Sequence, residues 1–208
     1  MPSSDLILII SGFFPDMIES LDCLREGARS GVRAHLDRAE AMALRIHLSE
    51  QSMARLTGHS EETDASLYVS IPGHIGRISG YLQVIASALK VKHRDDVLFS
   101  EKAMDEVDLL FAQLRELMEL ALAAVSGISG ISAVSGIIGN QAGSAADVAR
   151  AASGIETSAG KFLGLHEERL LEGLCLPKAS SIYLEMVDGF KAISWHLREI
   201  ALKTTANS

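Results

Sequence analysis

The side chains best suited to hold a ligand in this sequence are carboxylates in two acidic stretches. Glu185 and Asp188 lie three residues apart, and Glu101 and Asp105 lie in the second stretch. On a helix, residues three or four apart share a face, and carboxylate oxygens suit hard metal cations. A solvated helix face has the same pattern. These four residues therefore define an alternative function, a carboxylate-based metal-binding or small-ligand-binding helical bundle.

The histidines follow no recognised catalytic or metal-binding spacing. A ferritin-like di-iron bundle needs a Glu three residues before a His, and neither His166 nor His196 has one. His35, His47 and His59 recur every twelve residues, which turns each by about 120° around a helix and places them on different faces. The sequence also lacks the GxSxG, P-loop, HExxH and dinucleotide-binding motifs. We expect no enzyme, no catalytic residue and no cofactor.

Composition narrows the classes of partner. The 208 residues are 48% hydrophobic and carry a formal net charge of −8, so the chain is long enough to bury a core, and phosphate-backbone binding gains little from electrostatics. We expect no nucleic-acid partner. Cys23 and Cys175 are far apart and form no CxxC spacing, which predicts neither a disulfide framework nor a zinc site and suits a reducing cytoplasm.

Two apolar stretches raise the question of membrane insertion. The stretch over residues 6–10 is too short to cross a bilayer and has no basic region before it, as a signal peptide would. Residues 120–146 carry no charge and are long enough, but five Gly and five Ser dilute them and no aromatic or basic anchors flank them. We therefore expect close helix packing or a helix-to-helix turn there, and a cytoplasmic protein.

Apolar residues recur at intervals of three and four through most of the chain, which predicts long amphipathic helices and an all-α fold. Gly27 and Gly31 suit the end of the first helix, Ser100 the start of the fourth, and Pro177 the first turn of the sixth. Pro72 should kink the third. The apolar stripes cover residues 6–24, 32–56, 67–89, 103–125, 148–170 and 182–200, with a third N-terminus near Ser60 and a turn between Ser126 and Ser144.

The sequence also contains an internal similarity. A shift of 115 positions aligns the third expected helix with the sixth, and seven of the 21 positions from 66 to 86 are then identical. Serine, tyrosine and a closing Ile-Ala pair are among the matches, although two amphipathic helices can also agree by coincidence. If the chain is duplicated, it consists of two tandem three-helix bundles, over residues 1–95 and 96–208.

The aligned helices also carry a family resemblance. The third reads Ile-Gly-Arg-Ile-Ser-Gly-Tyr over 75–81 and Val-Ile-Ala over 84–86, and the sixth reads Phe-Lys-Ala-Ile-Ser-Trp-His over 190–196 and Glu-Ile-Ala over 199–201. These segments resemble the closing helices of the PhoU family of bacterial phosphate-uptake regulators, which carry a stretch like Leu-Glu-Arg-Ile-Gly-Asp-His/Tyr and then Asn-Ile-Ala. The run Leu-His-Glu-Glu-Arg-Leu over 165–170 is similar to the PhoU-like cytoplasmic domain of sodium/phosphate cotransporters.

The resemblance implies a fold of two pseudo-repeated three-helix bundles, PhoU-like and spectrin-repeat-like, and a non-enzymatic regulator of phosphate transport. Its implied partner is a phosphate transporter or the associated sensor kinase, with membrane association through that partner. A homo-oligomer is also expected. A third hypothesis is a structural, self-associating bundle. Apolar positions on the first helix beyond its core stripe, such as Ile9 and Ile18, either contact a second subunit or membrane protein or are covered by their own bundle.

The sequence departs from the family at its metal site. PhoU proteins bind metal clusters through Glu-x-x-x-Asp pairs in the closing helices. The matching positions hold Gly76, Gly80, Lys191 and Trp195, none of which supplies a carboxylate, and the lysine would repel a cation. We therefore expect no metal at these positions.

Overall fold

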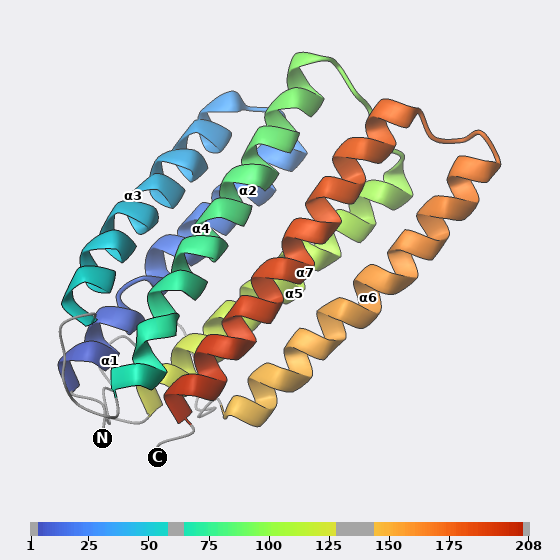
Figure 1. Cartoon of the computed structure of the whole chain (residues 1–208). Coiled ribbons are helices and arrows are strands. Elements are labelled where there is room, and N and C mark those ends of the chain that lie inside the picture. The colour runs from blue at the N-terminus through green and yellow to red at the C-terminus, as the bar shows by residue number, and fades with distance from the viewer. Residues whose placement is uncertain (1–3, 58–64, 128–143, 206–208) are drawn as a thin grey trace.

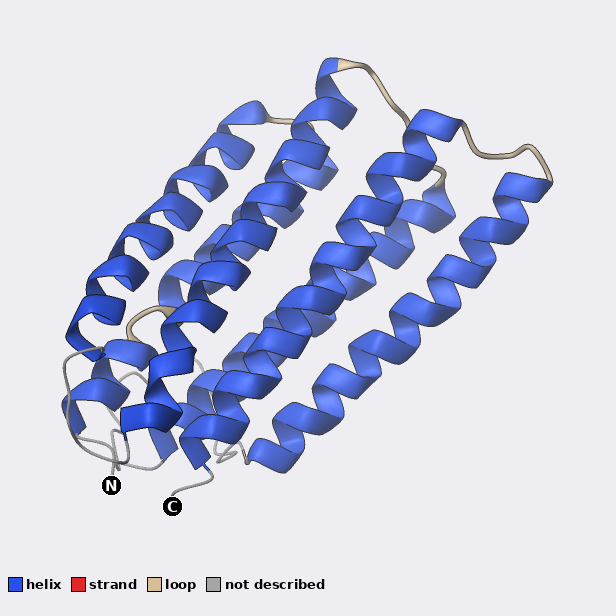
Figure 2. Ribbon diagram, viewed as in Figure 1, coloured by secondary structure: helices blue, strands red, loops and turns tan. Residues whose placement is uncertain are grey.

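The computed structural model describes residues 4–57, 65–127 and 144–205, and within these ranges the chain forms helices and no strand. The expected all-α fold is confirmed (Figure 2). The helices are α1 (Ser4–Ser11), α2 (Phe14–Ser30), α3 (Arg33–Thr57), α4 (Ala65–Arg94), α5 (Glu101–Ser126), α6 (Ala145–Leu171) and α7 (Pro177–Thr205).

The prediction of one continuous first helix is wrong, because the structure has two helices there, α1 and α2. Gly12 donates its N–H to the carbonyl oxygens of Leu8 and Ile9, at 3.0 and 3.2 Å, which closes α1. Pro15 then stands in the first turn of α2. Proline fits that position, whereas inside a continuous helix its ring would clash with the preceding turn. The apolar stripe continues across the break and conceals it from periodicity alone.

Several helix ends lie where local chemistry predicts them. α2 stops at Gly31, whose φ of 70° is the left-handed conformation that glycine adopts most easily. The Ser100 side chain accepts a hydrogen bond from the N–H of Ala103 at the start of α5, and Ser144 forms a capping box with Asp147 at the start of α6. α4 continues through Pro72. The expected N-terminus near Ser60 and most of the tract between Ser126 and Ser144 lie outside the described residues.

The helices pack as two groups that share one core (Figure 1). α2, α3 and α4 contact one another, as do α5, α6 and α7, while α4 packs on α7 and α2 on α5. The expected boundary at residues 95/96 falls in the connection between α4 and α5. Buried side chains from both sides of it form one hydrophobic cluster. The rings of Phe111 and Phe190, with centroids 4.7 Å apart, are part of that cluster.

The wide apolar face at the N-terminus is mostly covered by the molecule itself. Of the apolar positions beyond the core stripe, Phe14 is buried and Ile18 packs against the core, which favours coverage by the bundle itself, whereas Ile9 is 40% exposed. The described end of the uncharged 120–146 tract also packs in the core, through Ala121, Ala124 and Val125. Among the described helices, none combines the length and apolar character that a membrane span requires.

Candidate functional site

Gly76, Gly80, Lys191 and Trp195, which the PhoU resemblance aligned with metal-ligand positions, lie on α4 and α7, one of the two helix pairs that join the groups. The backbone at Gly76 faces the Glu50 carboxylate, so that a Cβ there would lie 3.1 Å from Glu50 Oε2, whereas a Cβ at Gly80 would meet open space. Lys191 is partly exposed and Trp195 about half exposed. None of these four residues carries a carboxylate, and the Glu50 carboxylate lies beside one of them, Gly76.

Two histidines meet at the contact between α4 and α7. The Nδ1 atoms of His74 and His196 lie 2.9 Å apart, so one ring donates and the other accepts. The rings of Trp195 and Tyr81 lie 4.8 and 6.0 Å from that of His196. Burial, His74 and nearby Arg77 lower the pKa of His196 to about 4, and burial also lowers the pKa of His74. Both shifts favour the neutral imidazole, and the shared hydrogen bond requires that at least one ring has an unprotonated Nδ1.

The four carboxylates of the alternative metal site do not form a ligand cluster. Glu101, Asp105, Glu185 and Asp188 are all exposed. Within the described residues, no three His, Cys, Asp or Glu side chains are placed to hold a metal ion together. Their acidic spacing belongs to solvated faces of α5 and α7.

A buried ionic network that the motif search missed joins α5, α6 and α7. Both terminal guanidinium nitrogens of Arg169 on α6 donate to the carboxylate of Glu106 on α5, at 2.8 and 2.7 Å. The Tyr183 hydroxyl on α7 donates to the same carboxylate, at 2.6 Å. Three helices thus converge on one carboxylate, which accepts three hydrogen bonds. Bidentate pairs of this kind fix both distance and orientation.

The surroundings of the network favour a charged Arg169 and a neutral Tyr183. The Glu106 carboxylate holds the pKa of Arg169 above its ordinary value, and burial together with Glu106 raises the pKa of Tyr183. The ring of His166 stacks on Tyr183 with centroids 4.6 Å apart. Burial, and then Arg169, lower the pKa of His166. Neither of its ring nitrogens has a hydrogen-bond partner within the described part of the chain.

Most residues of this network had drawn attention in the sequence, but for different reasons. Arg169 and His166 belong to the run that resembles the cotransporter domain, and Tyr183 is one of the positions repeated after 115 residues. Glu106 stands one residue after Asp105 and is turned from it by about 100° around α5, so it is buried where its neighbour is exposed. Nothing in the spacing of these residues along the chain indicates that they meet.

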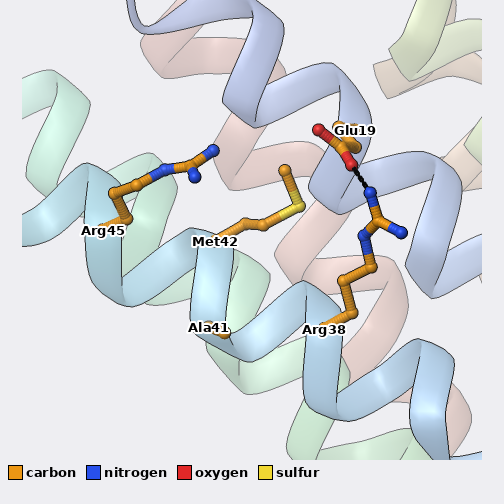
Figure 3. Close-up of a pocket in the computed structure, with 5 residues that line it drawn as sticks. All are labelled: Glu19, Arg38, Ala41, Met42 and Arg45. Atoms are coloured by element: carbon orange, nitrogen blue, oxygen red, sulfur yellow. Dashed lines mark hydrogen bonds and ion pairs between the residues drawn. The ribbon is translucent and has the colours of Figure 1, made fainter.

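A shallow depression lies between α2 and α3 and has a volume of about 330 Å³ (Figure 3). Its lining residues are Glu19, Arg38, Ala41, Met42 and Arg45. Both arginines already have acidic partners: Arg38 pairs with Glu19, and Arg45 donates to Asp16 at 2.8 Å through Nε. An anion bound here would have to compete with these carboxylates.

Comparisons with models of known protein families, with curated proteins and with solved structures found no match for the chain.

Proposed function

We propose that this protein is a non-enzymatic regulator of phosphate transport, resembling PhoU, that acts by docking on a phosphate transporter or its signalling kinase. The proposal includes a cytoplasmic location and a chain made of two related three-helix halves. Docking of a rigid helical face regulates a transporter if the face binds one of its conformations more tightly than another.

The observation that carries this proposal is which residues of α4 and α7 lie opposite one another. With the shift of 115 residues, His74 corresponds to Gly189 and Tyr81 to His196. His74 contacts His196. The equivalent pair, Gly189 and Tyr81, is also close in space, because a Cβ on Gly189 would lie 4.0 Å from the Tyr81 carbonyl oxygen and 3.0 Å from Ile85 Cγ1. Equivalent helices that pair in this way support a duplicated chain with a local twofold axis, and duplication of a three-helix unit is the core of the PhoU resemblance.

The helix pairing outside this register supports the same interpretation. α2 packs on α5 as α4 packs on α7, and in the proposed duplication each of these pairs joins equivalent helices. The two groups also have the same internal connectivity, because each contains three successive helices that all contact one another.

The test combines phosphate uptake with capture of the transporter. Deletion of the gene should change how uptake responds to external phosphate, and the tagged protein should capture a phosphate transporter or its kinase from membranes of the same cells. Unchanged uptake with no such capture would refute the regulator. A stable oligomer without capture would favour the structural bundle. A stoichiometric transition metal retained through dialysis would favour the metal-binding alternative.

A further inference from the structure

Exposed leucines gather at one end of the molecule. The connection between α4 and α5 contains Leu98, which is 81% exposed, and the end of α6 and its connection to α7 contain Leu171, Leu174 and Leu176, which are 82%, 69% and 69% exposed. Figure 1 shows both connections at the same end of the bundle. We call these four residues the leucine tip. Exposed apolar side chains that gather at one place, rimmed by polar residues, often mark a binding surface.

Contacts between the two connections hold the leucine tip in place. Lys178 at the start of α7 pairs with Asp95 in the first connection, at 2.9 Å. Phe99 in that connection packs edge-on against Tyr183, with ring centroids 6.0 Å apart. Tyr183 in turn donates to Glu106 in the buried network. These contacts hold the backbone that carries the leucines in one conformation, which lowers the conformational entropy lost when a partner binds.

The charges around the leucine tip determine which sign of charge its partner should carry. Of the exposed basic side chains beside the leucines, Arg94 and Lys178 are both paired with Asp95, and Lys102 lies next to Glu101 in the first turn of α5. Exposed carboxylates flank the same two connections, at Asp96, Glu167, Glu168 and Glu172. Two copies of this chain that met tip to tip would bring the same carboxylates together, which opposes pairing through this surface. A membrane surface with anionic lipids would be repelled as well.

We propose that the leucine tip binds an amphipathic segment of a partner protein that carries leucine-like side chains on one face and Lys or Arg beside them. This deepens the proposed function, because the cytoplasmic loops of membrane transporters are rich in Lys and Arg. The apolar face covers the leucines, and the basic side chains meet the surrounding carboxylates. The charges guide association and orientation, and the leucines supply the larger part of the affinity.

The test uses a synthetic helical peptide with leucines at spacings of three and four and lysines between them, and measures its binding to the full chain by fluorescence anisotropy. The same peptide with glutamates in place of the lysines is the charge control. The lysine peptide should bind and the glutamate peptide should not. Binding should weaken with added salt, because the Debye length falls from about 10 Å at 0.1 M to about 3 Å at 1 M.

Variants locate the binding site. The double variant Leu171→Ser, Leu174→Ser should raise Kd by about tenfold or more, because two leucine side chains lose their burial on binding. Leu44→Ser with Leu48→Ser is the control, since these two leucines on α3 are 52% and 56% exposed, lie one helical turn apart and are not part of the leucine tip. The control should leave Kd unchanged. Glu167→Gln with Glu172→Gln should reduce the salt dependence.

Four outcomes would overturn the proposal: equal binding of both peptides, equal loss in the two leucine variants, binding to vesicles of phosphatidylcholine and phosphatidylserine, or self-association that Leu171→Ser abolishes. These results are separable from the proposed function. If phosphate uptake depends on the protein but the peptide does not bind through the leucine tip, only the docking surface is wrong. If the peptide binds there and uptake is unaffected by gene deletion, only the transport role is wrong.

Discussion

Replacing Arg169 by Met tests the buried network that joins α5, α6 and α7. The change removes the guanidinium but keeps most of the apolar side-chain volume. Glu106 would then keep only the hydrogen bond from Tyr183, and its carboxylate would remain nearly enclosed. The two side chains of the pair are 9% and 11% exposed. Breaking one partner out of a buried ion pair costs about 3–5 kcal/mol, and because some solvent reaches this pair we expect about 3.

Two further variants separate the charge from the contacts. Tyr183→Phe removes one hydrogen bond to a charged group and should cost about 1.5–3 kcal/mol. The double variant Glu106→Leu, Arg169→Met replaces the pair by apolar side chains, which by itself is often close to neutral. It leaves the Tyr183 hydroxyl without its acceptor, so we expect a cost of about 1–3 kcal/mol. The double variant should therefore be no less stable than Arg169→Met alone.

The assay is urea unfolding followed by far-ultraviolet circular dichroism, with the free energy of unfolding taken at constant m-value. Arg33→Met is the control, because the side chains of Arg33 and Asp37 are 81% and 53% exposed. Exposed pairs of this kind contribute at most about 0.5 kcal/mol. If Arg169→Met destabilises the protein no more than Arg33→Met does, the network does not hold the three helices and the reasoning fails.

Glycine substitutions and pH give two further predictions. Gly27→Ala should destabilise the fold by about 1–3 kcal/mol, since a Cβ there would lie 2.4 Å from Leu36 Cδ2. Gly80→Ala should instead stabilise α4 by about 0.5–1 kcal/mol, because a Cβ there would meet open space. Thermal unfolding of both variants measures the two effects, and equal effects would contradict the prediction. Because the folded pKa of His196 is about 4 against about 6.5 when unfolded, the unfolded chain binds more protons between these values and stability should fall as pH drops from 6.5 to 4. His196→Gln, measured by urea unfolding at both ends of that window beside His35→Gln as control, should flatten this dependence, and an unchanged slope would refute the assignment to His196.

Helix termini were the part of the fold most open to prediction. Ser100, Gly31 and Pro177 each act within one turn of their own position, through a capping side chain, a left-handed φ or a missing N–H. Their effect does not depend on distant residues. Periodicity failed at Gly12 because a short break in a helix need not interrupt the apolar stripe.

The candidate sites were less predictable, because their members come from different helices. Glu106 and Arg169 are 63 residues apart, and His74 and His196 are 122 apart. Each residue alone has an ordinary explanation on its own helix. The carboxylates with a recognisable spacing, such as Glu185 and Asp188, turned out to be exposed, since helical spacing places residues on a common face without deciding which way that face points.

For this protein, sequence alone determined the all-α class and the residue types at the helix ends, because both follow from interactions between residues close together in the chain. It also determined that Gly76, Gly80, Lys191 and Trp195 supply no carboxylate. Tertiary structure decided which helices meet, and therefore which charges are buried as partners and which leucines are left in solvent. Burial and distance between remote segments depend on the packing of the whole bundle, and no local pattern encodes them.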